Sequence, residues 1–127
     1  MQKQIAEYRA QEIDLVKSTV LDDARADRII VLLGERDLVI SDQVEKIITH
    51  REEMSILNAD YDTERASFDK LMSNYIMQRK SGQQEIITLI AAMKKEMTVD
   101  EWRVISKFQL KRLNLRETGY RQASGGV

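Results

Sequence analysis

Proline and cysteine are both absent from this chain of 127 residues, and only five residues are glycine. Without cysteine, a disulfide framework, a thiolate zinc site and a cysteine nucleophile are all excluded. Without proline and with few glycines, positions that break a helix are scarce and signals for β-turns are nearly missing. Charged residues make up 32% of the chain and aromatic residues 6%. This balance suits long solvated helices better than a thick globular core.

Long apolar runs are also missing from the sequence. No run approaches the ~20 apolar residues that span a bilayer, so no membrane span is expected. The start, MQKQIAEYRAQE, lacks the continuous apolar core of a signal peptide. The protein is therefore either cytosolic or a mature chain in which Met1 replaces an export signal.

Charge is nearly balanced over the whole chain. The net charge of −1 provides no overall field for nucleic acid, and no nucleic-acid partner is expected. Near the C-terminal end a single acid, Glu117, is accompanied by basic residues: Lys107, Lys111, Arg112, Arg116 and Arg121. These bases either complement the dipole at the end of a helix or form a binding patch.

Helical periodicity indicates two helices in the first part of the chain. The first covers residues 3–19, and the second begins where Asp22 or Asp23 can cap it. Gly34 costs that helix about 1 kcal/mol relative to alanine, but its neighbours favour continuation through it. Near Asp42 the chain either bends or continues.

The middle of the chain has the most regular pattern. Apolar and a few polar residues alternate at spacings of four and three, as in a heptad seam: Ile40, Val44, Ile47, Arg51, Met54, Asn58, Tyr61, Arg65, Phe68, Met72 and Tyr75. A single helix over residues 42–80 would be about 58 Å long. Gly82 is expected in the left-handed position that ends this helix.

A short apolar helix over residues 83–96 and a further helix are predicted to follow. Thr98 and Glu101 have the spacing of a capping box. Met97 and Trp102 have the spacing of a hydrophobic staple, which fixes the direction in which a chain enters its helix. These four residues are predicted to form a structural corner.

The fold class that follows is all-α. We expect an elongated antiparallel helical hairpin or bundle, with one very long central helix and a short C-terminal helix pair. One helical domain covers residues 1–118, and residues 119–127, rich in glycine and polar residues, form a flexible tail.

Candidate chemistry is sparse. His50, the single histidine, has Glu53 and Met54 on the same helix face, but one imidazole with scattered carboxylates does not indicate a metal site. No catalytic triad and no glycine-rich phosphate loop is present, so neither catalytic residues nor a cofactor is predicted and the chain is not expected to be an enzyme.

Arg51 and Arg65 interrupt the apolar seam fourteen residues apart, about 21 Å along one helix. They either pair with acids of a neighbouring helix or mark an open face with apolar patches and fixed positive charge. An open face could hold exposed segments of other proteins. The candidate protein-binding residues are Arg51, Met54, Asn58, Tyr61, Arg65 and Phe68.

Two segments at expected helix starts carry a family resemblance. LDDAR, Leu21 to Arg25, and MTVDE, Met97 to Glu101, each place a capping residue after an apolar residue. With this layout over residues 20–115, the chain resembles the Spy/CpxP group of bacterial periplasmic proteins, including heavy-metal sensors of the CnrX and ZraP type. That group has a repeated LTxxQ-like signal at helix starts; neither segment here has the glutamine.

The resemblance implies a dimeric helical hairpin in the periplasm that acts as a chaperone or sensor in envelope stress or metal response. The sensor branch relies on histidine-rich ligands that this chain lacks. The leading hypothesis is therefore a non-enzymatic protein that binds a protein client or partner and forms a homodimer. The alternative is a cytosolic coiled-coil scaffold or adaptor whose heptad face mediates self-association.

Overall fold

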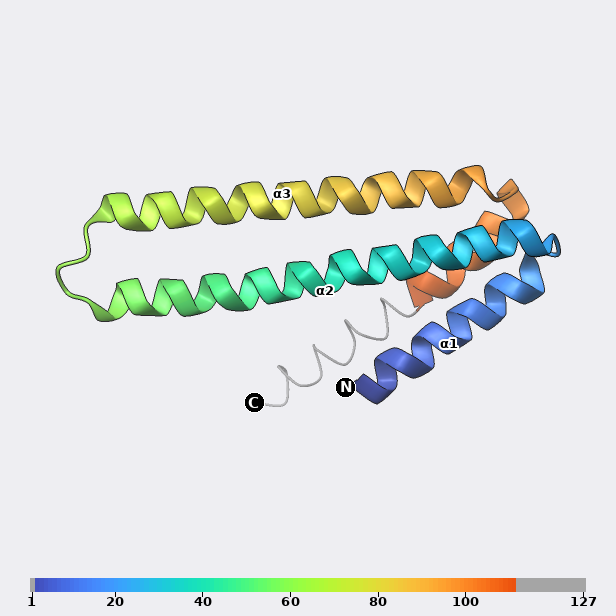
Figure 1. Ribbon diagram of the computed structural model, residues 1–127, viewed down its shortest axis with the longest axis horizontal. Helices are drawn as coiled ribbons and strands as arrows, with labels where there is room; N and C mark the ends of the chain where they lie inside the picture. Colours follow the sequence, from blue (N-terminus) through green and yellow to red (C-terminus); the bar gives the residue numbers. More distant parts are fainter. Residues whose placement is uncertain (1, 112–127) are drawn as a thin grey trace. The chain divides into compact units, whose positions relative to one another are not determined.

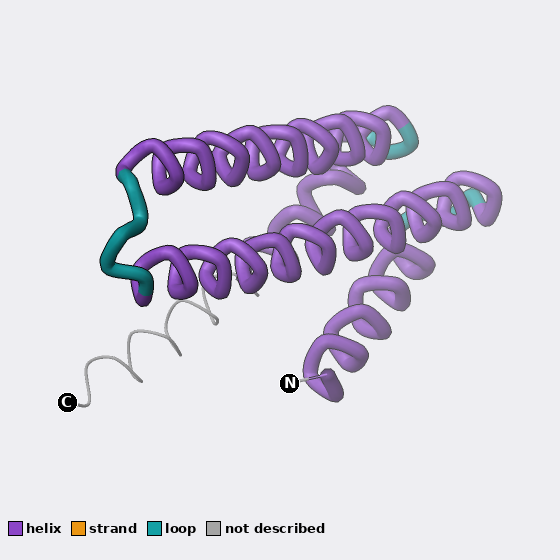
Figure 2. Tube along the Cα trace, turned by 60° about the vertical axis from the view of Figure 1, so that its left-hand side comes forward, coloured by secondary structure: helices purple, strands orange, loops and turns teal. Residues whose placement is uncertain are grey.

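The computed structural model describes residues 2–111, and this part of the chain is almost entirely helical (Figures 1 and 2). Its helices are α1 (Gln2–Thr19), α2 (Asp23–Ala59), α3 (Arg65–Lys95) and a last helix whose described part covers residues 99–111. No strand occurs within residues 2–111, which confirms the all-α class. The tail predicted for residues 119–127 lies outside the described residues.

The chain forms two compact units. We call Met1–Ile30 together with Met93–Val127 the terminal unit, because it contains both ends of the chain, and Val31–Ala92 the hairpin unit. Helices α2 and α3 each contribute residues to both units. A single domain over residues 1–118 stays a prediction.

The terminal unit has a closed apolar core. Its buried apolar side chains are Val16, Val20, Ala26, Ile29, Met93 and Ile105. Ala26 and Ile29 lie three residues apart on one face of α2, and Val20 directly follows the end of α1, four residues after Val16. Each large apolar side chain buried in this way contributes roughly 1.5–3 kcal/mol. At the rim, the rings of Tyr8 and Phe108 stack with centroids 5.4 Å apart. The core therefore joins α1, the start of α2, the end of α3 and the last helix.

The hairpin unit contains two antiparallel helical arms, residues 31–59 of α2 and residues 65–92 of α3 (Figure 1). A short loop reverses the chain between them. The carboxylate of Asp60 accepts a hydrogen bond from the amide of Asp62 at 3.0 Å, and its carbonyl accepts one from the amide of Thr63 at 3.1 Å. Such an Asx-turn replaces the backbone bonds that a continuing helix would make.

The bounds predicted for the long central helix are therefore wrong. A very long helix is present, but the chain reverses at residues 60–64, inside the span of 42–80 that was predicted to be continuous. The local signal was a run of turn-forming residues, Asn58 to Thr63. The heptad pattern continues across this run and masks it.

The role predicted for Gly82 is also wrong. Gly82 lies inside α3, and no glycine within the described residues has a positive φ. The short helix predicted over residues 83–96 is the last part of α3, which ends instead in a tightened turn: the amides of Glu96 and Met97 bond to carbonyls three residues earlier. At Gly82 a Cβ would meet the side-chain amide of Gln43, so the glycine permits close packing of the two arms.

Alanine substitutions at the two helical glycines of the hairpin unit are expected to differ in their effect on stability. Gly34→Ala is expected to stabilise the protein by about 1 kcal/mol, because a Cβ at residue 34 has no neighbour within 4 Å. Gly82→Ala is expected to gain clearly less, because the amide of Gln43 must move. Urea unfolding of both variants measures the difference. Equal gains at the two positions would contradict the packing assigned to Gly82.

Candidate functional site

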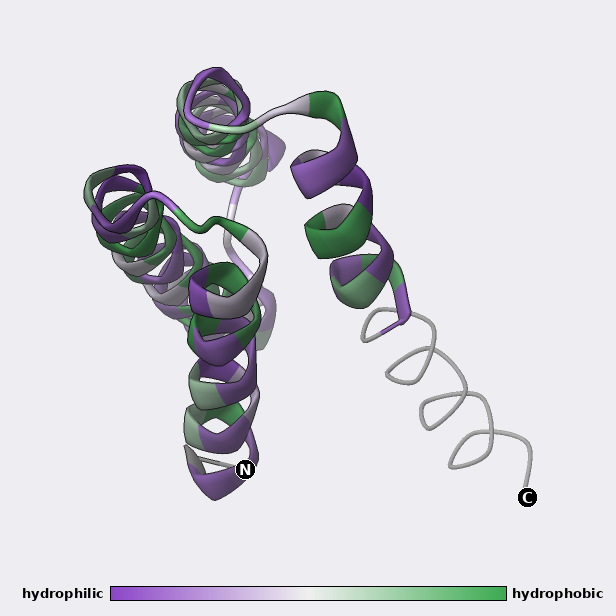
Figure 3. Cartoon of the chain, turned by 90° about the vertical axis from the view of Figure 1, so that its right-hand side faces the viewer, coloured by the Kyte–Doolittle hydropathy of each residue, from purple (hydrophilic) through white to green (hydrophobic). Residues whose placement is uncertain are grey.

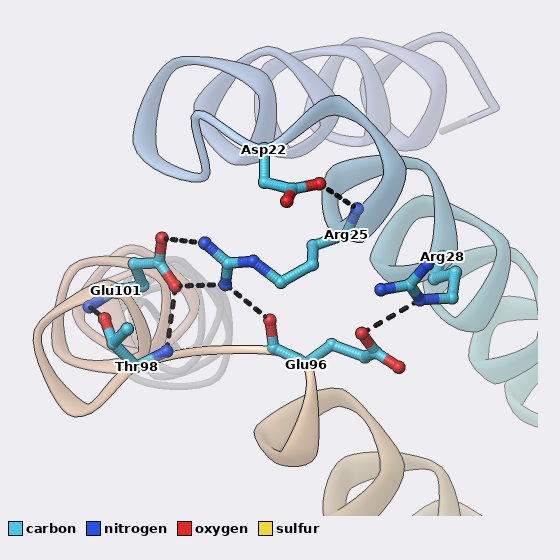
Figure 4. Close-up of polar contacts among 6 residues, drawn as sticks. All are labelled: Asp22, Arg25, Arg28, Glu96, Thr98 and Glu101. Atoms are coloured by element: carbon cyan, nitrogen blue, oxygen red, sulfur yellow. Dashed lines mark hydrogen bonds and ion pairs between the residues drawn. The ribbon is translucent and has the colours of Figure 1, made fainter.

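The predicted structural corner lies between α3 and the last helix (Figure 4). The amide of Glu101 donates a hydrogen bond to the hydroxyl of Thr98 at 3.2 Å, and the amide of Thr98 donates one to Glu101 Oε1 at 2.8 Å. These are the two reciprocal bonds of a capping box. Lys94 Nζ lies 4.9 Å from the ring centroid of Trp102, a cation–π contact across the corner. A direct contact between Met97 and Trp102 stays a prediction.

Arg25, at the start of α2, clamps this corner from across the terminal unit (Figure 4). Its Nη1 and Nη2 donate to the two carboxylate oxygens of Glu101 at 2.8 and 3.1 Å. Nη1 also donates to the carbonyl of Glu96 at 2.8 Å. One turn along α2, Arg28 Nε donates to the carboxylate of Glu96 at 2.9 Å. Bidentate arginine–carboxylate geometry fixes both orientation and distance. Through Arg25 and Arg28, α2 therefore binds the chain before and after the turn that joins α3 to the last helix.

The two segments that carry the family resemblance meet in this clamp. Asp22, rather than Asp23, caps α2, because its carboxylate accepts a hydrogen bond from the amide of Arg25 at 3.0 Å. Thr98 caps the last helix in the same way. The fifth residues of LDDAR and MTVDE, which occupy the glutamine position of the LTxxQ signal, are Arg25 and Glu101 and bond to each other.

Hydrogen bonding from Arg25, assisted by the amide of Thr98, lowers the pKa of Glu101 from 4.5 to about 2. The same pairing with Glu101 raises the pKa of Arg25. A carboxylate held ionised in this way is unsuited to proton transfer near neutral pH. The clamp is therefore a structural device.

A buried carboxylate connects α1 to the last helix. Glu12 is almost completely buried, and its Oε2 accepts a hydrogen bond from Gln109 Nε2 at 2.8 Å and a weak one from the hydroxyl of Tyr8 at 3.4 Å. Burial of a carboxylate requires such donors. No sequence pattern predicts this contact, because Glu12 and Gln109 lie 97 positions apart.

The two arms of the hairpin unit pack in a fixed register. The rings of His50 and Tyr75 stack with centroids 3.9 Å apart, and the side-chain amide of Gln43 packs against Gly82. His50 lies seven residues after Gln43 on α2, and Tyr75 lies seven residues before Gly82 on α3, as expected for a heptad seam. Hydrophobic and hydrophilic residues alternate around each helix (Figure 3). On each arm, the positions that face the other arm form the seam. The two sides of the helix on either side of the seam are its flanks.

On one flank of the hairpin acidic side chains outnumber basic ones: Glu35, Asp42, Glu53 and Glu85 against Lys46. A shallow groove of about 440 Å³ runs between the arms on this side and is lined from both helices: Glu35, Val39, Ser81, Gln84, Glu85, Thr88 and Leu89. Because helical positions repeat every seven residues, Asp42, Lys46 and Glu53 belong to the same flank. This shared lining shows that the corresponding flanks of α2 and α3 lie on one side of the hairpin.

The opposite flank is apolar on both arms. Ile40, Val44, Met72 and Ile76 are exposed there, and beside them Ile47, Met54, Ile86 and Ile90 are half-buried. We call these eight residues the apolar face. The positions on α2 belong to the predicted heptad seam, and they lie beside Gln43, His50 and Leu57, which face the other arm. Ile47 and Met54 of the predicted seam are half-buried, whereas Ile40 and Val44 are exposed.

The candidate protein-binding residues are partly brought together. Arg51, Met54 and Asn58 follow each other along the stripe of α2, and Arg51 and Asn58 are exposed. Phe68 is half-buried, Tyr61 lies fully exposed in the loop, and Arg65 begins α3, where it pairs with Asp69 at 3.7 Å. The separation of 21 Å predicted for Arg51 and Arg65 does not hold, because the chain reverses between them.

His50 serves the packing of the hairpin seam. Its ring covers Tyr75, and the guanidinium carbon of Arg79 lies 5.9 Å from the centroid of the same tyrosine ring. Within residues 2–111 no group of three or more histidine, aspartate and glutamate side chains is arranged to hold a metal ion. Over the same residues, no helix has the length and apolar character required to cross a membrane.

Comparison with known proteins leaves the chain without a neighbour: no family model, no curated protein and no solved structure matches it. The resemblance to the Spy/CpxP group stays a prediction.

The capping box predicts the effect of removing its hydroxyl. Thr98→Ala is expected to destabilise the terminal unit by about 1 kcal/mol, because the amide of Glu101 loses its acceptor. Ser106→Ala is the matched control, since Ser106 bonds only to a carbonyl within the same helix. Chemical unfolding followed by the fluorescence of Trp102 measures both. An equal loss for the two variants would argue against a capping role for Thr98.

The lowered pKa of Glu101 predicts a dependence of stability on pH. The clamp is fully present above pH 4.5 and is lost as the pH falls toward about 2, because protonation removes the charge that binds Arg25. The melting temperature of the wild type is expected to exceed that of Glu101→Gln at pH 6, and the difference is expected to shrink between pH 4.5 and 2.5. A difference that is independent of pH would contradict the assignment.

Proposed function

We propose that this chain is a non-enzymatic helical binding protein that holds segments of other proteins against the apolar face of its hairpin unit. The observation that carries the proposal is the exposure of Ile40, Val44, Met72 and Ile76 on one side of two paired helices. Exposed apolar side chains gathered on one side in this way are typical of interaction sites.

The two units divide the labour in this proposal. The terminal unit has a closed core and a clamp of charged hydrogen bonds, so it supplies stability. In the hairpin unit Leu33 is the one large apolar side chain among the described residues that reaches full burial. Segments with few buried contacts open more easily and adapt to partners, which suits a surface that binds varied protein segments.

The cellular setting is proposed from the resemblance alone. Similarity to the Spy/CpxP group supports a periplasmic protein that is chaperone-like or regulatory in envelope stress or metal response.

A second candidate, a cytosolic scaffold that self-associates, is favoured by the same exposed apolar face, because two hairpins could cover each other to form a four-helix bundle. Sedimentation velocity of the wild type and of Val44→Gln combined with Ile76→Gln separates the two. A dimer that the double variant converts to monomer supports the scaffold, whereas a monomer, or a dimer that the double variant retains, leaves the apolar face available for a client.

Matched substitutions test the binding face. Val44→Gln with Ile76→Gln is expected to weaken suppression of the aggregation of reduced α-lactalbumin, because two half-exposed side chains, 50% and 57%, no longer bury apolar area against the client. The loss is about 2 kcal/mol, or roughly 30-fold in affinity. Far-ultraviolet circular dichroism checks that helicity is retained.

The control for this experiment lies elsewhere on the same two arms. Leu38 and Met77 are more exposed than Val44 and Ile76, at 72% and 69%, and lie outside the apolar face; Met77 occupies the helical position of Gln84, which lines the groove on the opposite flank. Leu38→Gln with Met77→Gln is expected to leave suppression unchanged. Equal losses from the two double variants would reject the apolar face as the binding surface.

A further inference from the structure

The apolar face is built from two parallel stripes with heptad spacing. On α2 the stripe runs through Ile40, Val44, Ile47 and Met54, and on α3 it runs through Met72, Ile76, Ile86 and Ile90. Both stripes lie beside the closed seam on the same side of the hairpin, opposite the acidic groove. Two such stripes form the surface against which a third helix packs in a bundle.

The basic charges of this surface occupy the gaps in the stripes. Arg51 continues the stripe of α2 between Ile47 and Met54, and Arg79 continues the stripe of α3 between Ile76 and Ile86. Neither arginine has an ion-pair partner among residues 2–111; Arg79 only approaches the ring of Tyr75. An arginine fork placed beside apolar surface suits a carboxylate on the segment that covers it.

Resting on the proposed function, we propose that the segment bound to the apolar face is an acidic amphipathic helix of another protein, which adds a third helix to the hairpin. Its apolar stripe would cover the eight residues of the face, and its glutamate or aspartate side chains would pair with Arg51 and Arg79. The stripe from Met72 to Ile90 covers about 27 Å, the length of a helix of about 18 residues.

Charge argues against a second copy of this chain as the occupant. A symmetric pairing of two apolar faces would bring Arg51 and Arg79 of both copies into one interface. The acids of this flank, Asp37 and Asp69, lie toward its two ends, and each already pairs with a neighbouring arginine of its own helix. The opposite flank is acidic and would repel the same partner, so only one side of the hairpin fits it.

The experiment uses two synthetic probe helices of three heptads, both with leucine at the core positions. One probe carries glutamate at the flanking positions and the other carries lysine. Fluorescence anisotropy of the labelled probes, titrated with the whole chain, is expected to give a Kd for the acidic probe at least about tenfold lower than for the basic probe. Circular dichroism of the mixture is expected to show more helix than the sum of the separate components.

Variants locate the binding site of the probe. Arg51→Gln with Arg79→Gln is expected to raise the Kd of the acidic probe by about tenfold, whereas Lys70→Gln, which removes an exposed charge from the back of α3, is expected to leave it unchanged. Arg51→Gln alone, at a side chain with no charged partner, is expected to give a smaller rise in the same direction. Urea unfolding of each variant shows that the hairpin remains folded.

Several outcomes overturn this inference. The acidic helical partner is ruled out by equal affinity for the two probes, by an equal effect of Lys70→Gln, or by binding of the acidic probe without added helix. In each of these cases a result in the aggregation assay that depends on the apolar face still supports the proposed function. A dimer of the chain alone that the Val44→Gln, Ile76→Gln variant dissolves assigns the face to a second copy. Equal suppression of aggregation by the Val44→Gln, Ile76→Gln variant and the Leu38→Gln, Met77→Gln variant overturns the proposed function itself.

Discussion

Backbone amides at the starts of helices need hydrogen-bond acceptors, and the rest of this structure depends on how the chain supplies them. With no proline and, within residues 2–111, no residue of positive φ, every change of direction relies on a short polar side chain. Asp22, Asp60 and Thr98 each accept a bond from a nearby amide. Arg25 then fixes one of these turns from a distance by binding the residue that completes the capping box, Glu101.

Local spacing was enough to predict some of these features. The corner at Thr98 and Glu101 involves residues three positions apart, so a single sequence carries the whole signal. The clamp of Arg25 on Glu101 spans 76 positions, and no periodicity links the two residues. The place of Gly82 inside a helix could not be predicted, because a glycine after Arg79 and Lys80 has the same local sequence at the end of a helix and inside one. Only the packing of Gln43 against it distinguishes the two cases.

In the hairpin the predicted heptad pattern lies at the edge of the contact between the two arms and not at its centre. The stripe that contains Val44 is regular and apolar, but it lies next to the seam that closes on α3, and which stripe is paired depends on the register of the other arm. Stacking of His50 on Tyr75 sets that register. A hairpin with a second apolar stripe on each arm has more apolar positions than its own packing uses, and this surplus is the basis of the proposed binding surface.

The seven-residue register described for His50, Tyr75, Gln43 and Gly82 also limits how such a chain can change in length during evolution. A deletion of one residue in either arm would rotate the following stripe by about 100° and separate the two halves of the face. Loss or gain of seven residues in both arms together would shorten or lengthen the hairpin by about 10 Å and keep every flank in place. The loop at residues 60–64 lies outside this constraint. Relatives of this chain would therefore differ in arm length by matched heptads and in loop length freely.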